Sequence, residues 1–449
     1  MKKTYSFAAL LLLPILLSQI GCQEETLNPL DEQLIQQMKT SSYGEGVSYY
    51  QLPDSDDLEN IPQDPKNPLT AEKIELGKLI YHETAFAVDV KFSGSMKAIS
   101  CATCHHAAAG FQAGMAQGIA DGGTGFGVQG EGRVVDPLCP LDSIDVQETR
   151  TPSLLNVAYQ KVMRWNGSMG ATGSNLGTEA RWVGPAFSKN HLGFEGVETQ
   201  SIVALKGHRQ NMDPAVIQGT AYKDLFDAAF PTVPVAERYT NKMAGLAIAA
   251  YSRTVMANKA PFQEWVRGNY TAMTDQQKQG ALLFFGEAGC YRCHNGPSLA
   301  TEGFHAFGTK DLYQNTSAPI YNTSIDSIET LGRGGFTGNA ADMYRFKVPQ
   351  LYNVRDSPFE GHGGSFGSVR AMVDYKNKGI AENPNVPANR LSPMFVPLGL
   401  TEEQVDQIAD FIDNALHDDY LDRYVPSSLP TGACFPNADA QSKIDLGCN

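Results

Sequence analysis

Two stretches of identical pattern decide the fold of this chain: residues 101–105 read CATCH and residues 290–294 read CYRCH. Both have the form C-x-x-C-H, the attachment pattern of c-type haem, in which two thiols bond to the porphyrin and the adjacent imidazole ligates the iron. The predicted haem-binding residues are Cys101, Cys104, His105, Cys290, Cys293 and His294. A structural zinc site or two disulfides are the alternatives, because C-x-x-C alone serves either purpose. The histidine at the same offset in both motifs favours haem.

The residues around the two motifs also repeat, which predicts two related halves. The repeated pieces are apolar stretches at residues 76–81 and 279–285, and the hexapeptides PSLLNV at 152–157 and PQLYNV at 349–354. A Gly-Ser pair follows each hexapeptide at the same distance. Two residues before that pair, the first half has Trp165 and the second half has His362, so the two halves have diverged in role.

Helices are predicted wherever the chain shows a hydrophobic period close to that of a helix, so the fold class is mainly α. Capping boxes begin helices at Thr274 and Thr401, because a Thr followed three residues later by Gln satisfies the first backbone amides. Residues 241–257 are another predicted helix. The Gly-, Asn- and Asp-rich segments 106–149 and 303–345 are predicted to be long connecting loops.

The composition limits the class of protein. The chain has 449 residues and 42% hydrophobic residues, enough for two domains with real cores. Its 35 Lys and Arg residues and 49 Asp and Glu residues give a net charge of -14. This is the wrong sign for a chain that follows a phosphate backbone, so nucleic acid is not expected as a partner.

The first residues resemble an export signal. Residues 1–21 combine Lys2 and Lys3 with a short apolar stretch, and Cys22 follows in a loose lipoprotein cleavage box. This predicts a periplasmic protein that is anchored to a membrane by a lipid on Cys22, with a plain signal peptide as the alternative. Residues 22–65 are acidic and rich in Gln, Ser and Pro, and are predicted to form an extended, solvated tether.

Three further cysteines lie outside the two motifs. Cys434 and Cys448 are in a C-terminal tail, residues 426–449, where a disulfide between them would contribute about 3 kcal/mol. Cys139 then has no evident partner. It remains an alternative partner for either one, because sequence alone does not fix disulfide connectivity.

From residue 66 to residue 425 the chain resembles the bacterial diheme cytochrome c peroxidase family, which includes MauG-type enzymes. The elements that carry the resemblance, in the family's order, are Leu76-Gly77-Lys78, the first haem motif, Thr151-Pro152-Ser153, Trp165-Asn166-Gly167, Gly184-Pro185, the second haem motif and Phe346-Lys347-Val348-Pro349. The resemblance implies two cytochrome c-like haem domains in tandem. A peroxidatic domain is expected at residues 66–270 and an electron-transfer domain at residues 271–425.

The resemblance also implies a reaction, in which hydrogen peroxide is reduced to two waters with two electrons and two protons. The electrons are expected from a small periplasmic donor such as a cytochrome c, and the acidic chain predicts that this donor is basic. The family places a proton-transferring Glu after its Gly-Pro element, which makes Glu195 the first choice here and Glu198 the second. Trp165 matches a Trp that lies between the two haems and carries electron holes in the family.

The distal ligand of the second haem departs from the family pattern. Fourteen residues after the His of the second repeat, here His362, the family has Met in peroxidases and Tyr in MauG-type enzymes. This chain has Lys376 there, with Tyr375 beside it. Tyr375 or Lys376 is therefore the predicted ligand, and Met372 and Met394 remain alternatives.

Other ligands and functions stay open. His106, His191 and His208 are alternatives at the first iron, and a homodimer is not excluded. The family binds calcium between its domains through an Asn where this chain has Arg150, and a guanidinium there disfavours a cation. A peroxidase is the leading function. The alternatives are a MauG-like enzyme that oxidises a protein or organic substrate through a high-valent iron state, and a non-catalytic diheme electron-transfer protein.

Overall fold

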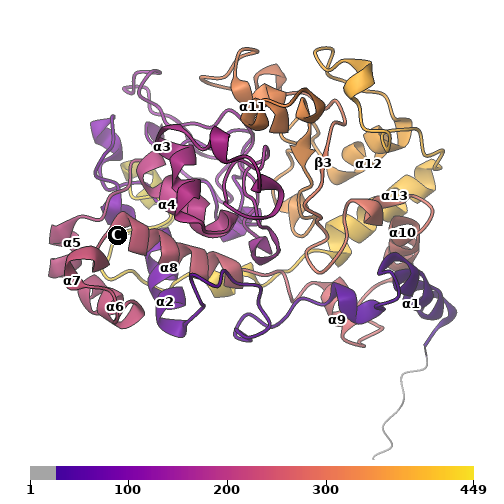
Figure 1. Ribbon diagram of the computed structural model, residues 1–449, viewed down its shortest axis with the longest axis horizontal. Coiled ribbons are helices and arrows are strands. Elements are labelled where there is room, and N and C mark those ends of the chain that lie inside the picture. Colours follow the sequence, from indigo (N-terminus) through magenta and orange to yellow (C-terminus); the bar gives the residue numbers. More distant parts are fainter. Residues whose placement is uncertain (1–26, 449) are drawn as a thin grey trace, which may run out of the picture.

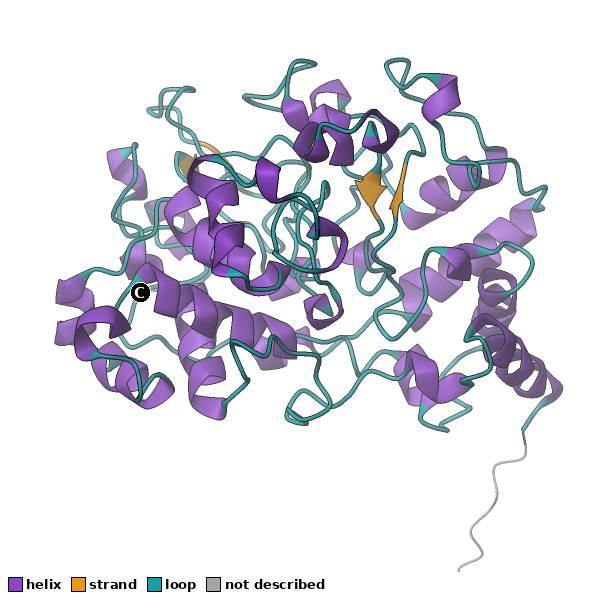
Figure 2. Ribbon diagram, in the orientation of Figure 1, coloured by secondary structure: helices purple, strands orange, loops and turns teal. Residues whose placement is uncertain are grey.

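The computed structural model describes residues 27–448. It is built mostly from helices and loops, with very little sheet (Figure 2), which confirms the predicted mainly α class. The predicted signal peptide and Cys22 lie outside the described residues. No helix in the described part is both long enough and apolar enough to cross a bilayer.

Fourteen α-helices occur among the described residues. They are α1 Pro29–Ser41, α2 Ala71–His82, α3 Gly184–Phe187, α4 Gly196–Gly207, α5 Pro214–Gly219, α6 Tyr222–Ala229, α7 Val235–Arg238, α8 Asn241–Thr254, α9 Pro261–Val266, α10 Asp275–Phe285, α11 Arg333–Thr337, α12 Val369–Lys378, α13 Glu402–Asp410 and α14 Ala440–Asp445. Two short antiparallel ribbons pair β1 Gly123–Thr124 with β2 Val134–Val135, and β3 Phe304–His305 with β4 Phe346–Lys347.

The same helix crossing occurs once in each half of the chain. Helix α2 packs against α8 in the first half, and α10 packs against α13 in the second (Figure 1). A glycine lies at each crossing. A Cβ on Gly77 would come within 1.9 Å of the Ala247 carbonyl oxygen, and a Cβ on Gly280 within 2.0 Å of the Gln407 carbonyl oxygen. The repeated apolar stretches therefore share a structural role, because only glycine lets the two backbones approach this closely.

The predicted helix signals are confirmed. Thr274 and Thr401 form capping boxes at the starts of α10 and α13. Helix α8 occupies most of the predicted segment 241–257. The apolar face of α13 continues through a π-helical turn at Phe411–Ala415, and this face is buried against α10.

The predicted extended tether is wrong over part of its length, because residues 29–41 form helix α1. Asn28 caps the helix and a proline occupies its first turn, both of which favour helix initiation. Leu34 and Met38 are fully buried, and α1 lies beside α10 of the second half. Asp31 forms a buried ion pair of 2.8 Å with Lys278. The apolar face of this helix is short and lies among polar residues, so its hydrophobic period is weak in the sequence.

The C-terminal tail crosses in the opposite direction and covers the first half (Figure 1). The disulfide joins Cys434 to Cys448, which confirms this pairing, and Cys139 is a buried free thiol. Asp439 forms a buried ion pair of 3.3 Å with Arg133. Each end of the described chain is thus docked on the half that is distant from it in sequence.

Candidate functional site

The first C-x-x-C-H motif forms a tight turn. Residues 101–103 are a 3-10 helix that begins after Ser100, and Ser100 and Thr103 cap one another. The tail supports this turn, since the Ser100 hydroxyl donates to the Pro436 carbonyl at 2.8 Å. His105 follows, and its Nδ1 lies 3.3 Å from the Phe111 carbonyl oxygen.

The second motif repeats this geometry. Residues 290–292 are again a 3-10 helix, and Nδ1 of His294 lies 3.1 Å from the Leu299 carbonyl oxygen. Pro152 and Pro349 begin the two repeated hexapeptides. Their backbone carbonyls also interact with the imidazoles of His105 and His294, respectively, and raise the pKa of each ring. The repeat in the sequence therefore places matching acceptors around both imidazoles.

Both motifs fit a c-type haem. Burial lowers the pKa of each imidazole to about 4, so the rings are neutral at neutral pH. A hydrogen bond from Nδ1 to a backbone carbonyl directs Nε2 toward a metal, and Nε2 of neither ring has a hydrogen-bond partner among residues 27–448. The residues present can therefore hold two haems through four thioethers and two proximal imidazoles.

The alternatives for the cysteine pairs do not fit. Neither pair is a disulfide. Burial raises the pKa of Cys101, Cys104 and Cys290 to about 12, so the metal-free thiols are protonated at neutral pH. Within the described residues, no group of three or more His, Cys, Asp or Glu side chains is arranged to hold a metal ion.

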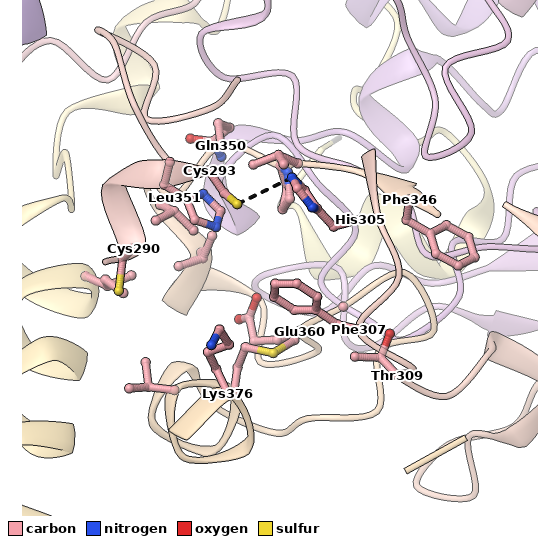
Figure 3. Close-up of a pocket in the computed structure, with 18 of the residues that line it drawn as sticks. Cys290, Cys293, His305, Phe307, Thr309, Phe346, Gln350, Leu351, Glu360 and Lys376 are labelled. Atoms are coloured by element: carbon pink, nitrogen blue, oxygen red, sulfur yellow. Dashed lines mark hydrogen bonds between the residues drawn. The ribbon is translucent and has the colours of Figure 1, made fainter. Parts of the chain in front are cut away.

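A cavity of about 450 Å³ opens beside the second motif and reaches the first half of the chain. Its wall includes the second motif itself and, from the first half, Arg150 and Trp165. Figure 3 shows Cys290 and Cys293 on one side of this space, with Lys376, Glu360 and His305 extending into it from other elements. Most of the wall is apolar, as expected for a site that encloses a porphyrin.

The cavity separates the two predicted distal ligands. Lys376 of α12 lines the cavity, and its positive charge lowers the pKa of both the Cys290 and the Cys293 thiol. Burial lowers the pKa of this amine. The hydroxyl of Tyr375 instead donates to the Phe307 carbonyl at 2.6 Å, and Tyr375 is not part of the cavity wall.

Three other side chains offer donor atoms in the same cavity. Met372 and Met394 line it, and Met394 Sδ lies 4.0 Å from Cys293 Sγ. His305 of β3 also lines it, with Nε2 only 3.4 Å from Cys293 Sγ (Figure 3). The sequence analysis did not select His305, because it is a single histidine within a loop that carries no motif.

Trp165 stands where the two halves meet. Its indole Nε1 donates to the Arg150 carbonyl at 2.8 Å, and its ring meets His362 edge-on at 6.3 Å between centroids. Trp165 and His362 occupy equivalent places in the repeat and contact one another across the junction of the two halves. Arg150 itself is buried and binds both halves, through Gln112 at 2.7 Å and the Ser357 hydroxyl at 2.7 Å.

Glu195 and Glu198 do not line the cavity. Both bind Arg253 of α8, which reaches Glu198 at 2.7 and 2.8 Å and Glu195 at 3.0 Å. Glu198 is fully enclosed and forms a bidentate pair, whereas Glu195 precedes α4, is partly exposed and uses one oxygen. Burial raises the pKa of Glu195. Sequence reasoning missed Arg253, the group that distinguishes the two carboxylates.

Each of the three histidines considered as alternative ligands of the first iron has a hydrogen-bond partner in the structure. His106 contacts the Gln129 carbonyl at 2.8 Å, and the exposed His191 contacts the Trp182 carbonyl at 3.2 Å. His208 pairs with Asp145 at 2.8 Å. The positive charge of a protonated His208 would lower the pKa of His105, and the His208 side chain is partly exposed to solvent.

The model of the di-haem cytochrome c peroxidase family matches residues 71–271. The methylamine utilization protein MauG of Methylorubrum extorquens is 28% identical over 359 residues, which are 79% of this chain and 81% of that protein. The cytochrome-c peroxidase IdrP1 of Pseudomonas sp. strain SCT is 26% identical over 388 residues, 81% of this chain and 87% of that protein.

Solved structures share the fold. A MauG-like protein associated with microbial copper homeostasis has a TM-score of 0.54 and 21% identity, covering 82% of this chain and 95% of its own. A variant of the diheme peroxidase BthA from Burkholderia thailandensis has a TM-score of 0.50 and 17% identity, covering 82% and 91%. At this level of identity these similarities concern architecture only.

Proposed function

We propose that this chain is a member of the di-haem cytochrome c peroxidase family, whose model matches residues 71–271, and that it reduces hydrogen peroxide to water with electrons from a small donor protein such as a cytochrome c. The observation that carries the proposal is the repeated geometry of the two C-x-x-C-H turns, whose imidazoles are each held through Nδ1 by a backbone carbonyl. Two relatives, from Pseudomonas sp. strain SCT and Escherichia coli, are named cytochrome c peroxidases.

In this proposal the two halves are haem c domains with different tasks. Residues 66–270 hold the peroxidatic haem, and residues 271–425 hold the electron-transfer haem. When bound, the haems supply the redox chemistry. Trp165 lines the cavity beside the second motif and contacts His362 of the second half, and its polarizable indole is suited to carry an electron hole from one half to the other.

Glu195 is the proposed proton-transfer residue at the first site. One of its oxygens is engaged by Arg253 and the side chain remains partly exposed, so the carboxyl can exchange a proton. Its raised pKa brings it closer to the pH at which acid–base catalysis is efficient. Glu198 is less suited, because both of its oxygens are bound to Arg253 in a fully buried pair.

Lys376 is the proposed distal ligand of the second haem. It is the member of the predicted pair that lines the cavity, while the Tyr375 hydroxyl is occupied by a backbone carbonyl. An amine nitrogen stabilises the oxidised iron more than a thioether does. The second site would therefore have a lower potential than one with a methionine ligand.

We place the protein in the periplasm, with a lipid anchor at Cys22 still a prediction. The charge of -14 supports a donor with a basic surface, and its association rate should fall as salt screens the attraction. Arg150 already supplies a cation between the halves. We therefore propose that no calcium is needed at that position.

A MauG-like oxidation of a protein or organic substrate is the second candidate function. Two observations favour it: the 28% identity to a methylamine utilization protein MauG and the absence of Met at the position of Lys376. The experiment that separates the candidates is steady-state peroxide consumption with a reduced cytochrome c donor. Rapid turnover supports the peroxidase, and a protein that holds two haems without turnover supports the alternatives.

Haem content must be measured on the same preparation. Pyridine haemochrome analysis should give two haems c per chain, and the mass of the chain should rise accordingly. One haem, or none, contradicts the diheme proposal whatever the turnover.

A further inference from the structure

Glu360 is a carboxylic acid aimed into the cavity beside the second motif (Figure 3). Its backbone amide donates to the Phe366 carbonyl at 2.8 Å, which closes the loop that contains His362. The side-chain atom Oε1 is buried and has no hydrogen-bond partner among residues 27–448. Polar atoms that are buried in native proteins are almost always satisfied, so this oxygen calls for an explanation.

No cation neutralises this carboxyl. Arg150 lines the same cavity, and its positive charge lowers the pKa of Glu360. The two side chains nevertheless form no ion pair within the described chain. Arg150 Nε is itself a buried atom without a hydrogen-bond partner there. Asp413, in the π-helical turn after α13, has the opposite effect, because its negative charge raises the pKa of Glu360. Besides the thiols of Cys290 and Cys293, the other charged or titratable side chains on the cavity wall are Arg164, Glu287, Arg292, His294, His305, Lys347, His362 and Lys376.

These surroundings make the carboxyl exchangeable rather than permanently charged. Burial raises the pKa of Glu360 to about 7, with Arg150 opposing and Asp413 adding to the rise. Both protonation states are therefore accessible near neutral pH. Burial also raises the pKa of the partly buried Asp413 to about 6, so a second exchangeable carboxyl interacts with Glu360 through its charge.

An electron that enters a buried site adds a negative charge to a medium of low dielectric constant, where charges interact strongly. A neighbouring carboxylate opposes that charge, and its protonation relieves the repulsion. We propose that Glu360 takes up one proton when the haem at Cys290 and Cys293 accepts one electron, and releases that proton when the electron leaves. The electron and the proton arrive together, so the net charge of the site does not change.

This inference rests on the proposed haem at the second motif but not on peroxide turnover. It is tested by spectroelectrochemical titration of the second haem in the wild-type holoprotein and in Glu360→Gln, over about two pH units on either side of 7. In the wild type, the reduction equilibrium constant should be nearly independent of pH well below 7, where the carboxyl is already protonated, and should fall by up to about tenfold per pH unit above 7, equivalent to about 59 mV for one electron. In Glu360→Gln it should change less than about twofold per pH unit.

Glu287→Gln is the matched control. It removes a carboxylate of the same type from the exposed rim of the same cavity, so it should leave the wild-type pH slope unchanged. A slope that persists in Glu360→Gln, or a wild type without any slope, overturns the proposal. Loss of the slope in Glu287→Gln as well would overturn the assignment to Glu360.

Infrared spectroscopy covers the case in which Glu360→Gln does not retain haem. The reduced-minus-oxidised difference spectrum of the wild type should show the carbonyl stretch of a newly protonated carboxylic acid, and in Glu360→Asp this band should remain at a shifted frequency. A wild-type spectrum without the band contradicts the proposal. An active peroxidase without the slope overturns this inference alone, a pH slope without peroxide turnover overturns only the proposed function, and absence of haem at the second motif overturns both.

Discussion

The two C-x-x-C-H turns are nearly identical, but their surroundings differ. The first is supported by the C-terminal tail, which binds Ser100 and pairs Asp439 with Arg133. The second opens on a cavity that contains Lys376 and the unpartnered carboxyl of Glu360. In the proposed function the repeat therefore specifies how a haem would be attached, while the non-repeated residues would specify what each site can do. The predictions below test this division, beginning with what the two halves share.

Removal of a proximal imidazole should have the largest effect. In His105→Gly and in His294→Gly, peroxide turnover should fall by more than about 100-fold, since loss of a group that merely orients a metal ligand already costs 10- to 100-fold. Each variant should lose the low-spin or high-spin spectrum of one haem only. The measurement is turnover together with the electronic spectrum of each variant.

Retained turnover in both variants would contradict the diheme mechanism. Retained turnover in His294→Gly alone would instead show that electrons reach the first site without the second haem, and the division of tasks between the halves would be wrong.

Replacement of the two acidic residues should separate chemistry from stability. Glu195→Gln should leave both haems attached and slow peroxide reduction by about 100-fold, the effect of losing an acid–base group. Glu198→Gln should cost about 3–5 kcal/mol of folding free energy, because it leaves the buried Arg253 guanidinium without its bidentate partner. The kinetic constants and the unfolding free energy of both variants should be measured.

The opposite pattern, a stable Glu198→Gln with slow turnover and an unaffected Glu195→Gln, would move the proton-transfer role to Glu198. That outcome would also show that sequence spacing misplaces the loop between Gly184 and α4.

The second haem site should respond to Lys376→Ala and not to Tyr375→Phe. Near-infrared magnetic circular dichroism of the ferric protein should show a nitrogen-ligand charge-transfer band that is lost in Lys376→Ala, and turnover should fall less than for the proximal ligands. Tyr375→Phe is the control, since Tyr375 does not line the cavity and its hydroxyl is bound to the Phe307 carbonyl. A thioether band that is unchanged in both variants would assign the ligand to Met372 or Met394.

Sequence reasoning succeeded where a short pattern determines the local geometry. The haem turns, the capping boxes at Thr274 and Thr401 and the glycine-bearing stretches all correspond to structure, because each depends on residues close together in the chain. The mainly α class follows from the same local signals.

It failed where partners are distant in sequence. The sequence of residues 29–41 predicts a tether and not helix α1, because the burial of this helix depends on α10, more than two hundred residues away. Arg253 and Glu360 carry no local motif, and their importance arises from what the fold places beside them. Tyr375 and Lys376 differ by one helical position, so only the orientation of α12 shows which side chain enters the cavity.

The smallest effect on activity is expected from the C-terminal disulfide. Cys434→Ser should reduce the unfolding free energy by about 3 kcal/mol, the loop-closure value for a bond that spans 14 residues. Turnover should be almost unchanged at low temperature, because the tail touches the first motif from outside and contributes no residue to the cavity. If thermal unfolding is followed through the absorption spectra of the two haems, the spectrum of the first haem should change at a lower temperature than that of the second. Cys139→Ser is the matched control, since it alters a buried thiol that forms no disulfide. If Cys434→Ser instead destabilised the second site first, the tail would not be the feature that distinguishes the two haem environments.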